Sequence, residues 1–137
     1  MRTLGALLML GLLSACAVKA TASHQLAESE WEFVNIDDEK PVSRAGSLRF
    51  TDGELTASIG CNRMGGNWRI EEGRLIAGPI EMTEMGCIKA NLFDQERALA
   101  SLLAAAPQLE LKDGRLVLQS RGHSAELRRI SPPQRSS

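Results

Sequence analysis

Glycine-containing turn signals between short alternating segments constrain the fold of this chain more than any other feature. Asp52-Gly53, Glu71-Glu72-Gly73 and Asp113-Gly114 each separate two runs that alternate between apolar and polar residues. Such turns favour β-hairpins, because glycine adopts a positive φ at little steric cost. The expected strands are residues 31–35, 47–51, 54–60, 67–70, 74–77, 109–112, 115–119 and 124–130. We therefore expect a curved, barrel-like antiparallel sheet of about seven or eight strands.

One segment has helical rather than strand periodicity. Asn91 is a suitable N-cap, and Pro107 lies just past the expected end of the helix. Between them, apolar residues recur at helical spacing: Leu92, Phe93, Leu99, Leu102, Leu103 and Ala106. The order strands, helix, strands predicts an α+β domain with one amphipathic α-helix across the open face or mouth of the sheet.

Composition excludes several classes of function. The 137 residues, 43% hydrophobic and 24% charged, suit one globular domain. The net charge of −1 comes from interspersed signs without a basic stripe, so nucleic acid is not an expected partner. Two histidines, His24 and His123, are too few for a polyhistidine metal centre. We expect no cofactor and no metal.

The N-terminus has the pattern of an export signal. Met-Arg-Thr precedes an apolar run at residues 4–13, and Ser14-Ala15-Cys16 follows. The run is too short to cross a hydrocarbon core about 30 Å thick. The segment ending at Cys16 resembles the lipobox of bacterial lipoproteins, which implies cleavage before Cys16 and its acylation. Residue 17 is Ala rather than Asp, which favours the outer membrane, facing the periplasm.

These features predict how the chain is divided. Residues 1–15 form a lipoprotein signal peptide, and residues 16–29 form the lipidated N-terminus and a flexible tether. Residues 30–131 form the domain, and residues 132–137 form a disordered tail. The expected membrane contact is the lipid anchor.

Two cysteines, Cys61 and Cys87, remain once Cys16 is assigned to lipid. An even pair in an oxidising compartment predicts a disulfide, worth about 3.5 kcal/mol for a loop of this length. The alternative is that both are reduced and buried as small hydrophobic residues.

Two runs of unusual residues surround these cysteines. Gly60-Cys61-Asn62-Arg63-Met64-Gly65-Gly66-Asn67-Trp68 is followed by Pro79-Ile80-Glu81-Met82-Thr83-Glu84-Met85-Gly86-Cys87. With Trp31 before them and Glu96-Arg97-Ala98-Leu99 after them, the runs resemble the META-domain or HslJ-like family. The resemblance implies a small α+β domain of exported or lipid-anchored bacterial proteins, associated with heat stress, without an established reaction. Trp68 and Glu84 depart from the residues commoner in that family.

The glycine-rich run is the candidate interaction site. Its three glycines and two asparagines indicate a loop with positive φ angles, and fixed loops often carry function. Asn62, Arg63 and Trp68 are the candidate interaction residues. The alternative is structural: Asn62 supplies a left-handed turn conformation, and Arg63 bonds backbone carbonyls.

Catalytic interpretations of other polar residues are weaker. We expect Glu81, Glu84 and Glu96 to be solvated surface carboxylates. His123 could pair with a serine, Ser58, Ser101 or Ser124, but the chain has no Gly-x-Ser-x-Gly sequence. We therefore expect no enzyme.

Three methionines lie near the cysteines in sequence. Met64, Met82 and Met85 could bind Cu(I) through their thioethers, but we favour a role as core filler. Two function classes remain. The first is an envelope lipoprotein that binds an unknown envelope protein in an interaction or stress-tolerance role. The second is a small-ligand or soft-metal binding module in the periplasm.

Overall fold

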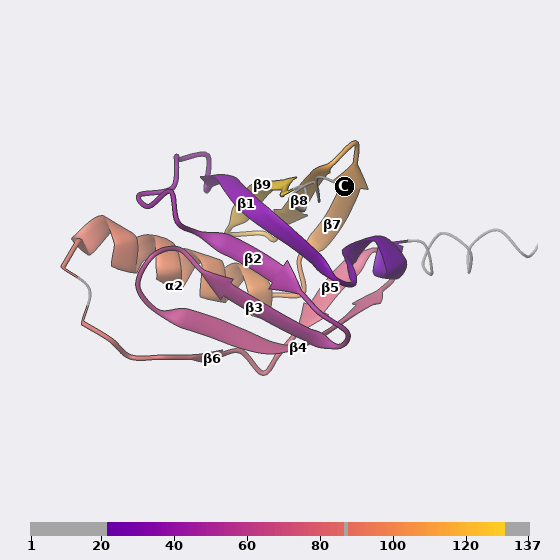
Figure 1. The fold of residues 1–137 in the computed structure, drawn as a ribbon, viewed down its shortest axis with the longest axis horizontal. Helices are drawn as coiled ribbons and strands as arrows, with labels where there is room; N and C mark the ends of the chain where they lie inside the picture. The colour runs from indigo at the N-terminus through magenta and orange to yellow at the C-terminus, as the bar shows by residue number, and fades with distance from the viewer. Residues whose placement is uncertain (1–21, 87, 131–137) are drawn as a thin grey trace, which may run out of the picture.

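The computed structural model describes residues 22–86 and 88–130, and the nine strands of this described part form one antiparallel sheet (Figure 1). The elements are β1 (Ser29–Ile36), β2 (Ser47–Phe50), β3 (Glu54–Ser58), β4 (Arg63–Glu71), β5 (Arg74–Ala77), β6 (Glu81–Met82), α2 (Ala90–Ala104), β7 (Gln108–Lys112), β8 (Arg115–Gln119) and β9 (Ser124–Arg129). Their order is β3-β2-β1-β9-β8-β7-β5-β4-β6, and a β3–β4 pairing closes eight of them into a barrel. β6 is an additional strand on β4. The predicted fold class, a barrel-like antiparallel sheet with a helix, is confirmed.

The hairpin turns follow the predicted chemistry. Glu72 and Gly73 both have positive φ, as do Asp113 and Gly114, which is the conformation of the two-residue turns that match strand twist. At the remaining turn Gly53 has a φ of 85°. Local sequence therefore sets these three hairpins.

A β-bulge in β1 keeps the apolar residues of that strand inside the barrel. Trp31 and Phe33 point inward at a spacing of two, but the next inward residue, Ile36, is three positions later. The register with β9 shifts between Phe33 and Asn35, and Val34 turns out to solvent. The additional residue restores the inward phase for Ile36.

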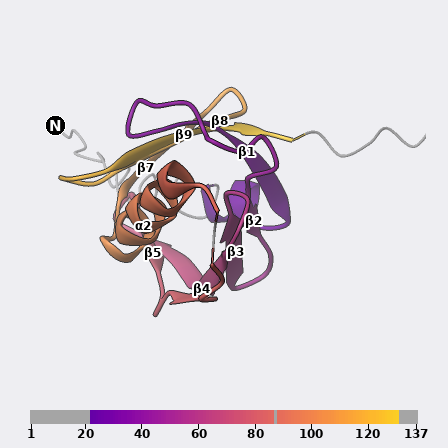
Figure 2. The same cartoon turned by 90° about the vertical axis from the view of Figure 1, so that its left-hand side faces the viewer.

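Helix α2 lies alongside the barrel, next to β5 and near the junction between β5 and β7 (Figure 2). Only one residue pair, Arg74 and Gln108, joins those two strands. The helix buries Leu92, Leu99, Leu102 and Leu103 against the inward residues of the strands. Burial of each such leucine contributes about 2 kcal/mol. The barrel interior is thus a packed core.

The helix boundaries differ slightly from those predicted. Lys89, not Asn91, is the N-cap residue, and it makes no side-chain capping hydrogen bond. The helix ends at Ala104, and Ala106 has a φ of 50°. In place of a cap, the side chains of Gln95 and Glu96 form hydrogen bonds with loops outside the helix, described below, and these hold its first turns. Among the described residues, no helix is long and apolar enough to span a bilayer.

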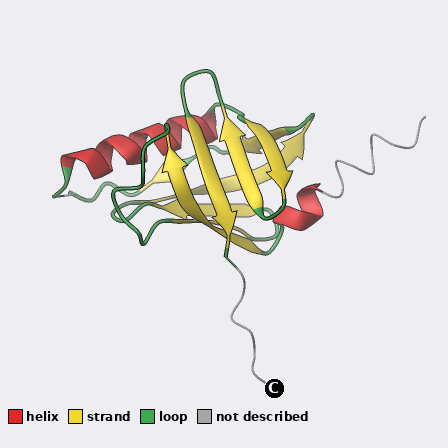
Figure 3. Ribbon diagram, turned by 90° about the horizontal axis from the view of Figure 1, so that it is seen from above, coloured by secondary structure: helices red, strands yellow, loops and turns green. Residues whose placement is uncertain are grey.

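The domain begins earlier than predicted. Residues 22–26, assigned to the flexible tether, form a helical turn at one end of the barrel, and Leu26 is fully buried (Figure 3). Ser29 donates a hydrogen bond to the Leu26 carbonyl and accepts one from Trp31 Nε1 at 2.7 Å. The boundary at residue 30 was therefore placed too late. The predicted signal peptide, Cys16 and the tail at 132–137 lie outside the described residues.

The glycine-rich run is mostly strand rather than loop. Gly60 has a positive φ, but Gly65 and Gly66 lie within β4 and do not. Their lack of a side chain serves close packing. A Cβ on Gly66 would lie 2.7 Å from the Pro79 carbonyl oxygen, and one on Gly65 would lie 3.0 Å from the Leu55 carbonyl oxygen. The predicted loop was wrong beyond residue 62 for this reason.

Candidate functional site

A groove of about 570 Å³ lies on the outer face of β2, β3, β4 and β6. Two cross-strand rows form its floor. Arg49, Thr56, Gly65 and Glu81 are successive register partners in the first row. In the second row, Ser47 pairs with Ser58 and Ser58 with Arg63, which exchanges hydrogen bonds with Thr83.

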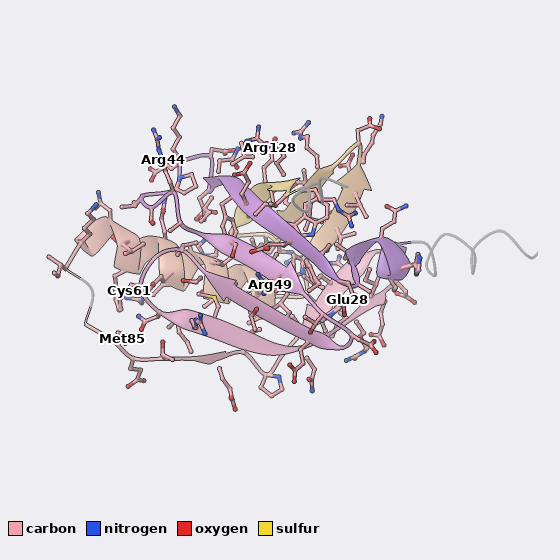
Figure 4. The ribbon with its side chains drawn as sticks, in the orientation of Figure 1. Glu28, Arg44, Arg49, Cys61, Met85 and Arg128 are labelled. Carbon is pink, nitrogen blue, oxygen red and sulfur yellow. The ribbon has the colours of Figure 1, made fainter. Side chains whose placement is uncertain are left out.

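The centre of the groove is formed by small residues, and its borders carry charge. Four strands at about 4.8 Å spacing give a width of about 14 Å. Arg49 stands on β2, in the middle of the face seen in Figure 4, and forms an ion pair with Glu30 at 3.1 Å. Arg63 is exposed at the start of β4, and Glu81 is exposed across from Gly65. The groove can therefore bind a polar, extended ligand.

Asn62 lies next to the groove but is buried, with an exposed fraction of 2%. Its backbone N–H donates to Glu96 Oε1 at 2.7 Å, and its Nδ2 donates to Glu96 Oε2 at 2.9 Å. Its Oδ1 accepts from the Met85 backbone N–H at 2.7 Å and from Thr83 Oγ1 at 3.1 Å. Asn62 thus joins the end of the groove, helix α2 and the segment after β6. We call this the Asn62–Glu96 clamp.

The clamp corrects two sequence interpretations. Glu96 is fully buried rather than solvated, whereas Glu81 and Glu84 are exposed as expected. Asn62 is not among the residues with positive φ, so it does not supply a left-handed turn. A buried carboxylate requires hydrogen-bond donors, and the two N–H groups of Asn62 provide them.

A second polar contact of α2 fixes the loop between β1 and β2. Gln95 Nε2 donates to the Lys40 carbonyl at 2.9 Å, and Gln95 Oε1 accepts from the Val42 N–H at 2.8 Å. Together with the clamp, this contact holds loops from two sides onto the first turns of the helix.

Cys61 is disulfide-bonded, next to the clamp and on the side of Met85 in Figure 4. Cys87, the partner that the sequence predicts, lies outside the described residues. The disulfide occupies the Cys61 sulfur, so it is not a free thiolate ligand for a soft metal.

The methionines are divided between core and surface. Met64 is 2% exposed within the core, and its register partner Met82 packs against that core. Met85 is 63% exposed. Among the described residues, no group of three or more His, Cys, Asp or Glu could hold a metal ion.

Trp68 belongs to the barrel wall rather than to an interaction site with Asn62. Its Nε1 donates to the Thr51 carbonyl at 2.9 Å, and its ring meets Phe50 edge to face at 5.0 Å. Six residue steps of extended chain lead from Asn62 to Trp68, a distance of about 20 Å. Of the three candidate interaction residues, only Arg63 is exposed at the groove.

His123 pairs with a carboxylate at another turn. Its Nδ1 lies 2.7 Å from Asp37 Oδ2, while Asp37 Oδ1 accepts from the Ser124 backbone N–H at 2.9 Å. Ser120 Oγ donates to the His123 carbonyl, not to its ring. These contacts join the β1 end to the turn before β9, and among the described residues no serine hydroxyl bonds the His123 ring.

The sequence matches the META domain family over residues 24–131. The chain belongs to the META domain family. No curated protein matches it significantly. The match includes the buried Leu26 and both halves of the Asn62–Glu96 clamp.

Several solved structures share the fold, among them the following three. A protein solved by NMR is 20% identical, with a TM-score of 0.69, covering 77% of this chain and 92% of its own. An NMR structure from Burkholderia xenovorans is 17% identical, with a TM-score of 0.65 and coverages of 82% and 88%. A DUF4847 family protein from Bacteroides vulgatus is 14% identical, with a TM-score of 0.54 and coverages of 78% and 96%.

Most of the groove was not anticipated from the sequence. Thr56 was expected only as a strand residue, Ser58 as a strand residue and a weak catalytic candidate, and β6 was not expected at all. The alternation of Thr56 and Ser58 with buried Leu55 and Ala57 does show that they face outward. Nothing local in the sequence shows that Glu81 and Arg49 lie on the same face, because β2 and β6 are paired through two other strands.

Proposed function

We propose that this META domain protein is a non-enzymatic lipoprotein of the bacterial cell envelope that binds an envelope protein through the groove on β2, β3, β4 and β6. The observation that carries this proposal is the packed barrel interior, which leaves binding to the outer surface. The groove combines small floor residues with exposed arginine and carboxylate groups, so it offers hydrogen bonds and charge to a partner.

The proposed location is the periplasmic face of the outer membrane, with lipid on Cys16. The export pattern and the lipobox-like segment at residues 13–16 support it, as does Ala17. From Cys16 to Ala22 the chain can span at most about 20 Å, which would keep the barrel near the membrane. Residues 22–26 lie at the opposite end of the long axis from the start of α2 (Figure 1). The groove would lie along the side of such a molecule.

A role in stress tolerance follows from this arrangement as a proposal. A small domain with a packed core and a disulfide at Cys61 is suited to the oxidising envelope. Such a domain would stay folded and able to bind its partner under conditions that unfold other envelope proteins. The partner would be an envelope protein, held near the membrane by the anchor of this chain.

Photo-crosslinking in intact cells tests the proposal. A benzophenone amino acid replaces Thr56, exposed in the groove, or Glu110, exposed on the outer face of β7 as the matched control. We expect one discrete crosslinked envelope protein from position 56 and none from position 110. Equal products from both positions, or no product from position 56, would contradict the proposal.

A further inference from the structure

We infer that the groove takes an extended acidic peptide segment of its partner, with one carboxylate bound by Arg63 and a second near Arg49. The inference rests on the proposed function and specifies the chemistry of its partner. Carboxylates are the natural ligands of arginine, because the planar guanidinium donates two parallel hydrogen bonds to one carboxylate.

Two arginines line the groove, and Arg63 is the one whose side chain is available to a ligand. It is exposed, and within the described residues its guanidinium makes no ion pair or hydrogen bond. By contrast, several other arginines on the barrel surface form ion pairs. Arg49 contacts Glu30 at 3.1 Å, Arg115 contacts Glu126 at 2.8 Å, and Arg128 contacts Glu32. An unpaired guanidinium beside a groove of small residues can therefore bind an incoming anion without losing an internal contact.

The two arginines have a spacing that suits an extended chain. The register places Gly65, two residues beyond Arg63 on β4, in the same row as Arg49 on β2. Two strand spacings across and two residues along give about 12 Å between the two Cα positions. In an extended peptide, carboxylates four residues apart are about 13 Å apart. The hydroxyls of Thr56 and Ser58 lie between them and can bond the peptide backbone.

Other ligands fit the groove less well. Its lining contains no aromatic side chain on which a sugar ring could stack. Glu30 and Glu81 flank the arginines, so the electrostatic potential of the groove is not positive enough to bind a polyphosphate. The terminal segments of this chain lack the chemistry, because residues 16–21 and 131–137 contain Lys19 and Arg135 but no Asp or Glu.

Peptide capture tests the inference with residues 16–137, the chain that follows the proposed cleavage site. The probe is a library of acetylated, amidated nonapeptides with Glu at positions 3 and 7 and random residues elsewhere. Its twin library has Gln at both positions. Captured peptides are sequenced by mass spectrometry, and the affinities of the most enriched ones are measured at low and physiological salt.

We expect the Glu library to be enriched over the Gln library and the affinity to fall with salt. Arg63→Ala should weaken binding about tenfold, and Arg63→Lys should restore part of it, since lysine keeps the charge but not the paired geometry. Glu81→Gln should strengthen binding about twofold, because it removes a repelling carboxylate.

Equal capture of both libraries, or unchanged affinity in Arg63→Ala, overturns the inference. The crosslink from position 56 then shows whether only the acidic peptide is wrong or the proposed function as well. If that position still crosslinks an envelope protein in cells, the groove is an interaction surface for other chemistry. If it does not, the proposed function fails as well.

Discussion

Replacing Asn62 with alanine is expected to be the most destabilising single truncation among the polar residues near the groove. The substitution removes the Nδ2 donor at 2.9 Å from Glu96 Oε2 and the Oδ1 acceptor for the Met85 N–H. Thr83 loses a partner too, but it is exposed and water can replace the bond. Glu96 is fully buried, so water cannot readily replace its lost donor.

The expected loss follows from these contacts. A hydrogen bond to a buried charged group is worth about 1.5 to 3 kcal/mol, and leaving the Met85 amide short of its acceptor adds to the cost. We expect Asn62→Ala to lower the free energy of unfolding by about 2 to 4 kcal/mol. For a domain of this size that corresponds to a fall in Tm of about 8 to 15 °C.

The matched control is the adjacent residue. Arg63→Ala truncates an exposed side chain and should change stability by less than about 0.5 kcal/mol. Urea unfolding monitored by circular dichroism gives both values, and thermal unfolding gives the two Tm values. If Asn62→Ala is as stable as Arg63→Ala, the clamp does not stabilise the fold and the reasoning is refuted.

Three further substitutions test separate parts of the account. Gly66→Ala should lower the free energy of unfolding by about 1 to 3 kcal/mol, because its Cβ would lie 2.7 Å from a carbonyl oxygen. In the control Gly122→Ala the new Cβ meets nothing within 4 Å, so the midpoint of urea unfolding should be nearly unchanged. Cys61→Ser should lower stability by about 2 to 5 kcal/mol in calorimetry, and non-reducing peptide mapping should find Cys61 linked to Cys87; two free thiols in protein taken from the envelope would disprove that pairing. Cys16→Ala should abolish incorporation of radiolabelled palmitate, and a variant that keeps the label would rule out Cys16 as the lipid site.

Sequence predicted the parts of this fold that depend on neighbours in the chain. Turn residues such as Asp113 and Gly114 specify their hairpin within two positions, and the helical period of the leucines in α2 is visible without any partner. Strand alternation likewise identified most of the barrel wall. These patterns involve residues close together in the sequence, so they can be recognised without the tertiary structure.

The parts that the sequence did not predict depend on distant neighbours. Gly65 and Gly66 suggested a loop, but their small size serves backbone approaches by Leu55 and Pro79. Glu96 was expected at the surface. Its burial depends on hydrogen bonds with Asn62, which is 34 residues away in the sequence and gives no local signal. Leu26 suggested a tether, and its burial is visible only once the barrel end is in place.

The candidate site was only partly accessible for the same reason. Arg63, a candidate interaction residue from the sequence, is exposed at the groove, but grouping it with Asn62 and Trp68 treated three different environments as one. Asn62 is buried in a hydrogen-bond network, and Trp68 packs in the barrel wall about 20 Å away. Cross-strand register, which no local pattern reveals, placed Arg63 beside Ser58 and near Arg49.

The crosslink from position 56 in intact cells, measured with Arg63 or Ala at position 63, decides whether the groove binds an envelope protein through Arg63. We expect Arg63→Ala to remove most of the crosslinked product while the Tm of the purified protein stays within about 2 °C of the parent. Full crosslinking in the Arg63→Ala protein, with the fold intact, would contradict partner binding through Arg63, and the absence of any product from both proteins would contradict a partner-binding role for the groove.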